Sequence, residues 1–387
     1  MERLAYLVRR LLLVIPTFIG ITVVCFALTR FLPGGPVEMR LMRMKGLGAA
    51  AESGGGAVAG GNQVTEEDKK QLEMRLMRMK GLGNAAAESG GGTVAGRNQV
   101  TEEYRKQLES QFGFDKPIVR QYWDWLVVNR MGMNIPSYDY PDRTAWQLIR
   151  SRIPVSLGFG LASFILTYLI CIPLGIVKAL RHRKPFDAIS SVIVFMAYAV
   201  PSFALAMVLK MAFCGTVEGL FDVFPLGGLS SDFDLEPSFW TAAVDRVWHM
   251  VLPVACYVAG SFAMLTILMK NSLLDQISAD YVRTVIAKGA SRRRAIWGHA
   301  FRNALIPIAT GLGPMIGLLF AGSIIIESIF EIPGMGRLSW DALVGRDYAV
   351  FLALLALTAS FQLIGNLISD MLYMVIDPRV DFGAKKC

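Results

Sequence analysis

The chain has 387 residues, of which 53% are hydrophobic and 18% are charged, and its formal net charge is +8. It contains several apolar runs of roughly 20 residues or more, a pattern that excludes an ordinary soluble domain and predicts membrane spans. The basic residues gather at alternate junctions between these runs, which is typical of cytoplasmic loops and argues against nucleic-acid binding.

Leu11–Phe31 is the first long apolar run, and Arg9 and Arg10 precede it. A cleaved signal peptide is the alternative interpretation. The run is longer than the apolar region of a signal peptide, however, and no small-x-small cleavage pattern follows before Pro33. We therefore predict an uncleaved first span whose N-terminus lies in the cytoplasm.

Residues 32–153 form a long segment that we expect outside the cytoplasm, and part of it is duplicated. Glu38–Gly48 recurs at Glu73–Gly83, and Asn62–Glu67 recurs at Asn98–Glu103, a period of about 35 residues. Two copies are too few for a solenoid, so copies 38–72 and 73–108 indicate a tandem duplication of one insert. Two roles stay open for it, a tolerated surface insertion and a docking surface for a soluble binding protein.

Aromatic and apolar residues between Glu102 and Val128 suggest a pair of interfacial helices around Pro117, since tryptophan and tyrosine favour the membrane boundary. We expect Pro201 to kink the third span and the glycines of the fifth span to allow close helix packing. The five further apolar runs are Pro154–Leu180, Ser190–Phe213, Met250–Met269, Ile306–Phe330 and Val350–Ile376.

The charge distribution predicts the orientation of these spans. Residues 1–10, 178–187, 270–304 and 377–387 together hold 17 lysines and arginines against six acidic residues, whereas residues 214–249 are net acidic. Because short cytoplasmic loops are enriched in lysine and arginine, this pattern predicts six spans with both termini inside.

The basic segment 279–307, between the fourth and fifth spans, is the most informative stretch. It reads as two short helices with a break between them. Lys288 suits the last turn of the first helix, Gly289 suits a left-handed C-cap, and Ser291 suits the N-cap of the second. Pro307 would then fall in the first turn of the next apolar helix. Taken alone, the segment is equally compatible with an ordinary positive loop.

Three strings in this segment carry a resemblance: Asp280-Tyr-Val-Arg-Thr284, Ala287-Lys-Gly-Ala-Ser291 and Arg302-Asn-Ala-Leu-Ile-Pro307. They closely resemble the EAA loop of ABC importer permeases of the oligopeptide and dipeptide (binding-protein-dependent) family. In that family the loop carries the coupling helix that docks on the ATPase subunit. The generic loop has Glu-Ala-Ala where this chain has Arg283-Thr284-Val285. The resemblance therefore implies docking, but not the family's usual glutamate contact.

The resemblance implies that the ATPase-coupling residues lie in this loop. They are Tyr281, Arg283, Thr284, Ala287, Lys288, Gly289, Ser291, Arg292, Arg293, Arg294, Arg302 and Asn303.

Further strings extend the resemblance over most of the chain outside the insert. Pro33-Gly-Gly-Pro-Val37, Phe221-Asp-Val-Phe-Pro225, Lys270-Asn-Ser272 and Arg379-Val-Asp381 look most like the Yej-type oligopeptide and microcin C branch. The resemblance implies an all-α integral membrane protein with the six-helix type I ABC importer permease fold. It also implies ATP-driven uptake of oligopeptides, including peptide-like antibiotics such as microcin C, by alternating access.

The same resemblance gives the expected domains, partners and location. Residues 1–145 would hold the first span and the extracytoplasmic segment, 146–376 the ABC type-1 permease domain, and 377–387 a cytoplasmic tail. The partners would be a second homologous permease, one or more ABC ATPase subunits and an extracytoplasmic peptide-binding protein. The location would be the bacterial cytoplasmic (inner) membrane.

Polar residues within the spans are candidates for the substrate path, namely Gln362, Asn366 and Glu327. Lys210 and Asp370 are also polar, but like Glu327 they lie near span ends. For residues in such positions we favour snorkelling to the interface, or helix packing, over a role in the substrate path.

We expect no catalytic residue, no metal site and no cofactor bound by this chain, with ATP and Mg on a partner ATPase. The three histidines lack metal-ligand spacing, and no glycine loop of the nucleotide-binding kind is present. The runner-up hypothesis is an ion-coupled secondary transporter, which would usually show repeated span sets and charges at the membrane midplane. An intramembrane enzyme would need a nucleophile or metal constellation within the spans.

Overall fold

The structure, a computed structural model, describes residues 2–31, 106, 110, 115–215, 221–231, 233 and 238–376. The expected insert 38–108 (apart from Lys106), the glycine-proline exit at 33–36 and the tail 377–387 lie outside the described residues. The chain divides into two compact units, residues 1–27 with 129–387 and residues 28–128.

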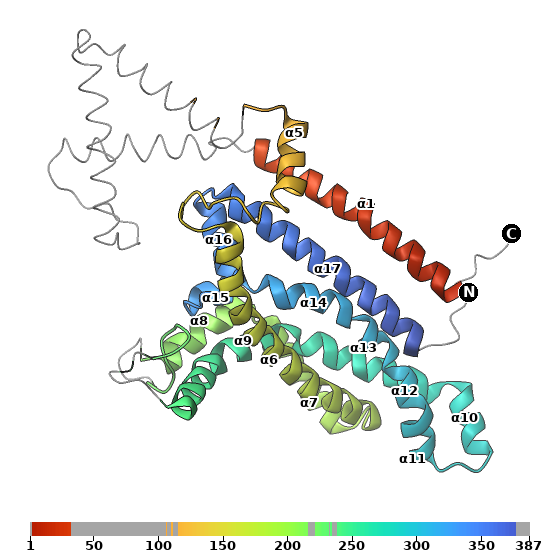
Figure 1. Ribbon diagram of the computed structural model, residues 1–387. Helices are drawn as coiled ribbons and strands as arrows, with labels where there is room; N and C mark the ends of the chain where they lie inside the picture. The colour runs from red at the N-terminus through yellow and green to blue at the C-terminus, as the bar shows by residue number, and fades with distance from the viewer. Residues whose placement is uncertain are drawn as a thin grey trace, which may run out of the picture. The chain divides into compact units, whose positions relative to one another are not determined.

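The described residues are mostly helical, and no β-strand forms among them. The smaller unit holds α5 (Ile118–Trp123) and the π-helix η1 (Asp124–Val128). The first helix, α1 (Glu2–Phe31), begins in the larger unit. The remaining helices, shown in Figure 1, are α6 (Ala145–Leu180), α7 (Pro185–Ala199), α8 (Ser202–Phe213), α9 (Phe239–Ser278), α10 (Asp280–Ala287), α11 (Arg292–Ala295), the π-helix η2 (Ile296–Ala300), α12 (Phe301–Ala304), α13 (Ile306–Thr310), α14 (Leu312–Ala321), α15 (Ile324–Ile329), α16 (Met335–Val344) and α17 (Tyr348–Ile376).

Four of these helices are long and apolar enough to cross a membrane, within Val8–Thr29, Ala145–Leu180, Phe239–Ser278 and Tyr348–Leu372. Two bent pairs raise the number to six if each pair counts as one span. The predicted fold class, an all-α integral membrane protein, is confirmed. All six predicted spans overlap these four helices and two pairs.

Two spans begin well before their predicted first residues. The second span starts at Ala145 rather than Pro154, and Pro154 lies inside the helix. The start is fixed by a capping box, in which Gln147 N donates to Thr144 Oγ1 (3.3 Å) and Thr144 N donates to Gln147 Oε1 (2.9 Å). Similarly, α9 starts at Phe239 rather than Met250. In both cases the early turns carry charged side chains, which conceal the helix from a search for apolar runs.

The third predicted span breaks at the proline that was expected to kink it. Val200 is extended (φ −84°, ψ 118°), as the residue before a proline prefers, and α7 and α8 meet at an angle of 90° across Pro201. The fifth predicted span, 306–330, also breaks. Gly322 adopts a φ of +68°, and the next residue, Ser323, caps α15 by accepting a hydrogen bond from Ile326 N.

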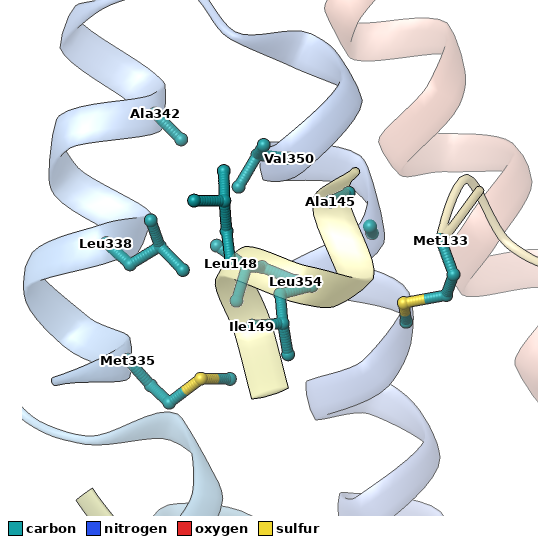
Figure 2. Close-up of a cluster of buried hydrophobic side chains, with 10 residues drawn as sticks. Met133, Ala145, Leu148, Ile149, Met335, Leu338, Ala342, Val350 and Leu354 are labelled. Carbon is teal, nitrogen blue, oxygen red and sulfur yellow. The ribbon is translucent and has the colours of Figure 1, made fainter. Parts of the chain in front are cut away.

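One core cluster joins the first turns of α6 to α16 and α17. Leu148 and Ile149 of α6 pack with Leu338 of α16 and with Val350 and Leu354 of α17, as Figure 2 shows. Ile149 is fully buried, and Leu354 is 3% exposed. Burial of these side chains explains why the helix continues back beyond Pro154.

Asp347 holds this end of the larger unit together. Its Oδ1 accepts from Val350 N (3.2 Å), which caps α17, and its Oδ2 accepts from Ser137 Oγ and from Tyr138 N (3.0 Å). The side chain is 2% exposed, and this burial raises its pKa above the ordinary value. One carboxylate therefore ties the segment before α6 to the start of α17.

In the smaller unit, Lys116 precedes the helix that starts after Pro117. Lys116 Nζ lies 2.8 Å from Asp124 Oδ2, and this hydrogen bond lowers the pKa of Asp124. A helix, α5 with η1, is present where the second of the two interfacial helices was expected, whereas most of the first lies outside the described residues, and the interfacial position stays a prediction.

We expect Asp347→Ala to lower the free energy of unfolding by about 2–3 kcal/mol, because it removes an N-cap and leaves buried donors without an acceptor. Thermal unfolding of the purified protein in detergent measures the change. Asp341→Ala is the matched control, since the Asp341 side chain is 64% exposed and lies 4.0 Å from Arg337. Equal losses in the two variants would contradict the role given to Asp347.

Candidate functional site

The basic segment 279–304 forms a helical hairpin, here called the basic hairpin (Figure 1). Lys288 ends α10, Gly289 turns the chain with a φ of +92°, and Ser291 Oγ accepts from Arg294 N at 3.3 Å. Pro307 lies in the first turn of α13. The predicted local structure, two short helices separated by a glycine turn, is confirmed.

One face of the basic hairpin is buried against two long helices. Val282 of α10 is 2% exposed, and the alanines Ala295, Ala300 and Ala304 are fully buried. They share a core cluster with residues at the ends of α6 and α9: Ile176, Ala179, Met269 and Leu273. Small side chains let the hairpin approach the ends of these helices closely.

Hydrogen bonds fix the hairpin on α9. Tyr281 Oη donates to Gln276 Oε1 (2.8 Å) and accepts from Asn303 Nδ2 (3.1 Å). Nearby, Ser272 Oγ donates to Ala304 O (2.8 Å) in a buried position. The structure therefore brings two of the predicted residues, Tyr281 and Asn303, together as anchors of the hairpin.

The opposite face of the hairpin is exposed and strongly basic. Its acidic member, Asp280, lies 3.5 Å from Arg283 in a pair whose side chains are 95% and 74% exposed, so it offsets little of the positive charge. Two apolar side chains are also exposed here, Ile286 at 41% and Trp297 at 47%. The other predicted coupling residues on this face are Thr284, Ala287, Lys288, Gly289, Ser291, Arg292, Arg293, Arg294 and Arg302.

Sequence reasoning missed the buried face of the hairpin. Ala295, Ala300 and Ala304 recur at four- and five-residue intervals, and this spacing could have marked a packed face. The contribution of Ser272 gave no comparable signal, because its partner lies 32 residues away.

Glu327 is enclosed by helix ends. Its Oε1 accepts from Ser156 Oγ (2.9 Å) and from Ser323 N (3.3 Å), while Oε2 accepts from Arg337 N (2.8 Å). The side chain is 1% exposed, and Gly334 and Gly336 leave the room that it occupies. This carboxylate therefore holds α15, α16 and α6 together, and none of these contacts faces an open path.

Gln362 and Asn366 lie one turn apart on α17 and bond to each other, Nε2 to Oδ1 at 3.1 Å. Asn366 is exposed and Gln362 is half-buried. Gly317 of α14 makes room for Gln362, since a Cβ there would lie 2.2 Å from Gln362 Oε1. In the same interface a Cβ on Gly313 would lie 2.3 Å from Gly365 O. Close packing through Gly313 and Gly317, predicted from the glycines of the fifth span, is confirmed.

The other two polar candidates lie in helix-to-helix contacts. Lys210 Nζ donates to Ile329 O (2.6 Å) and lies 3.5 Å from Glu331 Oε1. Asp370 Oδ2 lies 3.3 Å from Arg10 Nε, which joins α17 to α1. Among the described residues, no group of three or more histidine, cysteine or acidic side chains is arranged to hold a metal ion.

Comparison with known proteins shows one family. The pattern described as "Binding-protein-dependent transport system inner membrane component" matches residues 171–382. The "Peptidoglycan transport system permease protein YejB" of Agrobacterium fabrum is 36% identical over 382 residues, which cover 98% of each chain. The "Inner membrane ABC transporter permease protein YejB" of Escherichia coli O157:H7 is 37% identical over 98% of this chain and 100% of its own length. The "Oligopeptide transport system permease protein AppB" of Bacillus subtilis is 29% identical over 98% and 99%.

We expect Gly313→Ala to lower the free energy of unfolding by about 2 kcal/mol, because the new methyl group would force α14 away from α17. Thermal unfolding in detergent checks this. Gly260→Ala is the matched control, since a Cβ at this helical position meets no atom within 4 Å. A loss of stability in both variants would argue against a specific α14–α17 contact.

Proposed function

The chain belongs to the family of binding-protein-dependent transport inner membrane components and is the permease subunit of an ABC importer, and we propose that it carries oligopeptides. The observation that carries the substrate proposal is the similarity over 98% of this chain to permeases named for peptidoglycan and oligopeptide transport. Peptide-like antibiotics such as microcin C fall within the proposed substrate class.

The basic hairpin is the proposed docking element for an ABC ATPase. Its buried face makes it rigid with α6 and α9, and its exposed face offers basic side chains and Trp297 to a partner. Closure of the ATPases on ATP would push the hairpin and shift the membrane helices between outward- and inward-facing states. A ligand drives such a change only through different affinities for the two states.

The proposed topology places both termini and the basic hairpin in the cytoplasm of a bacterium, with the chain in the inner membrane. Residues 1–145 form the first span and an extracytoplasmic segment with the duplicated insert, 146–376 the permease domain, and 377–387 the tail. The proposed partners are a second permease, one or more ATPase subunits that bind ATP and Mg, and an extracytoplasmic peptide-binding protein.

Gln362 and Asn366 are the proposed lining of the substrate path. Two amides on a membrane helix need polar neighbours or water, because an unpaired polar group in lipid costs several kcal/mol (roughly 2–7). The two side chains bond to each other. Because both amides are uncharged, a path lined by them would not select peptides by their charge. The enclosed position of Glu327 favours a role in holding helices together instead.

The first experiment is gentle purification from the native membrane, followed by identification of the proteins that remain bound. An ABC ATPase and a second permease should be recovered, and ATP hydrolysis with the binding protein should rise with oligopeptides. A series from tripeptides to octapeptides, beside purified peptidoglycan fragments, defines the substrate. Recovery of the chain alone, with uptake that follows an ion gradient, would favour a secondary transporter instead.

We predict that Gly289→Val abolishes peptide uptake while the protein still inserts in the membrane. A branched side chain is strained at a φ of +92°, so the hairpin turn would be distorted. Uptake by whole cells and the amount of protein in the membrane are measured together. Gly298→Val, at an exposed position with no positive φ, is the control, and Gly289→Asn should keep partial uptake because asparagine tolerates this conformation. Normal uptake by Gly289→Val would contradict the coupling role.

Reversal of the charge on Arg292, Arg293 and Arg294 to glutamate should weaken ATPase binding at least tenfold, because exposed basic side chains dominate this face. Binding of the purified ATPase to the permease is measured at low and high salt, and the wild-type affinity should fall as salt rises. If these arginines only set the orientation of the chain, the inserted variant will bind the ATPase normally.

A further inference from the structure

A buried cluster of charges joins three helices close to the basic hairpin. Lys178 lies near the end of α6 and is 1% exposed, Asp187 lies in the first turn of α7 and is 6% exposed, and Lys270 lies on α9. We call these three side chains the Asp187 junction. None of them belongs to the basic hairpin.

The contacts within the junction are short and numerous. Lys270 Nζ lies 2.7 Å and 2.8 Å from the two carboxylate oxygens of Asp187. Lys178 Nζ donates to Ser190 Oγ (2.8 Å), Ser191 Oγ (2.7 Å) and Asp187 O (3.1 Å), and it lies 3.3 Å from Asp187 Oδ1. His182 Nδ1 also lies 3.3 Å from Asp187 Oδ2. One carboxylate thus joins lysines from two helices to the first turn of a third.

Orientation of the chain in the membrane does not require such an arrangement. A lysine that only sets topology keeps its ammonium group in water, as long basic side chains near helix ends usually do. Here the ammonium of Lys178 is buried, which carries a large desolvation penalty. Because buried ion pairs seldom increase stability over well-packed apolar residues, the arrangement favours a role in fixing how the helices are placed.

The junction and the basic hairpin hold the same turns of α6 and α9. Ile176 and Ala179 flank Lys178, and Met269 is the neighbour of Lys270. These three apolar residues belong to the cluster that buries Val282 and Ala295 of the hairpin. A displacement of the hairpin therefore acts on the helix turns to which Asp187 is bonded.

Beyond the junction, α7 ends at a sharp break. The chain turns by 90° at Pro201, where α8 begins, and the residue before the proline is extended. A helix held at one end and interrupted at the other can tilt as a unit, with the break acting as a hinge.

We propose that Asp187 is a positioning residue that makes α7 move together with the basic hairpin, so that ATPase closure reaches the third span. The inference rests on the proposed coupling role of the hairpin. The hairpin contacts α6 and α9 directly, through apolar side chains. The Asp187 junction adds a second connection, from these helices to α7, and this second connection depends on charge.

The test uses the complete complex of permeases, ATPase and binding protein in proteoliposomes. The quantity measured is the number of peptides taken up per ATP hydrolysed, with the oligopeptide that most stimulates the wild-type complex. Asp187→Asn should lower this ratio at least about fivefold, the lower end of ordinary coupling effects. Lys270→Met should lower the ratio as well, although this variant keeps Lys178 and Asp187 as a balanced pair. The conservative variant Asp187→Glu should keep most of the wild-type ratio.

The ratio separates a positioning role from a structural one. If Asp187 only stabilises the fold, the variants yield fewer complexes, but each complex transports the normal number of peptides per ATP, and the inference is overturned.

Asp370→Asn is the matched control, since it breaks another ion pair between helices of the same unit. If Gly289→Val uncouples transport but the Asp187 variants do not, only this inference fails. If neither uncouples, the proposed coupling role fails first.

A second measurement needs no change in the junction. Spin labels replace exposed residues on α7 (Ile193), the hairpin (His299) and α8 (Met211). Between the ADP state and the vanadate-trapped state, the distance from 193 to 299 should stay constant, while the distance from 193 to 211 changes. A change in the first distance with none in the second would overturn the inference even if the variants fail to assemble.

Discussion

A charged side chain that leaves water must find all its partners within the protein, and this requirement shapes the larger unit. Three carboxylates are buried among its described residues, those of Asp187, Glu327 and Asp347, and each lies where a helix begins or a helix path is interrupted. Each one accepts hydrogen bonds both from a neighbouring turn and from one segment at least 83 residues away in the sequence. The breaks that give this permease its shape are thus held by a small number of buried charges rather than by apolar packing alone.

The same requirement separates the two faces of the basic hairpin. Alanines and Val282 bury one face against α6 and α9, while the arginines remain in water on the other. Tyr281 and Asn303, which resemblance to the family assigned to the coupling loop, bond to each other on the boundary between these faces. A loop whose charges are exposed and whose opposite face is packed against α6 and α9 can bind a partner without first becoming ordered, which keeps the entropic cost of binding low.

The sequence predicted most of what depends on local rules. Gly289 and Ser291 lie in the predicted capping positions, Pro307 lies in the predicted first turn of its helix, and Pro201 interrupts its helix. The starts of α6 and α9 were predicted too late, because their early turns mix charged and apolar residues. The Asp187 junction was not predicted at all, because Lys178 in a basic run reads as a topological signal and Lys270 lies 83 residues from Asp187. Contacts between residues so far apart are invisible to a search for periodicity and composition.

The length of α9 has a mechanical consequence. With 40 residues the helix is about 60 Å long, roughly twice the thickness of the hydrocarbon core of a bilayer. One end bears the hydrogen bonds to the basic hairpin, and the other begins beside the segment 221–231, to which Trp248 donates a hydrogen bond. If α9 turns as one body, a rotation of about 10° around its midpoint displaces each end by about 5 Å. A movement of the hairpin end would then be accompanied by a movement of similar, side-chain size at the far end of the same helix.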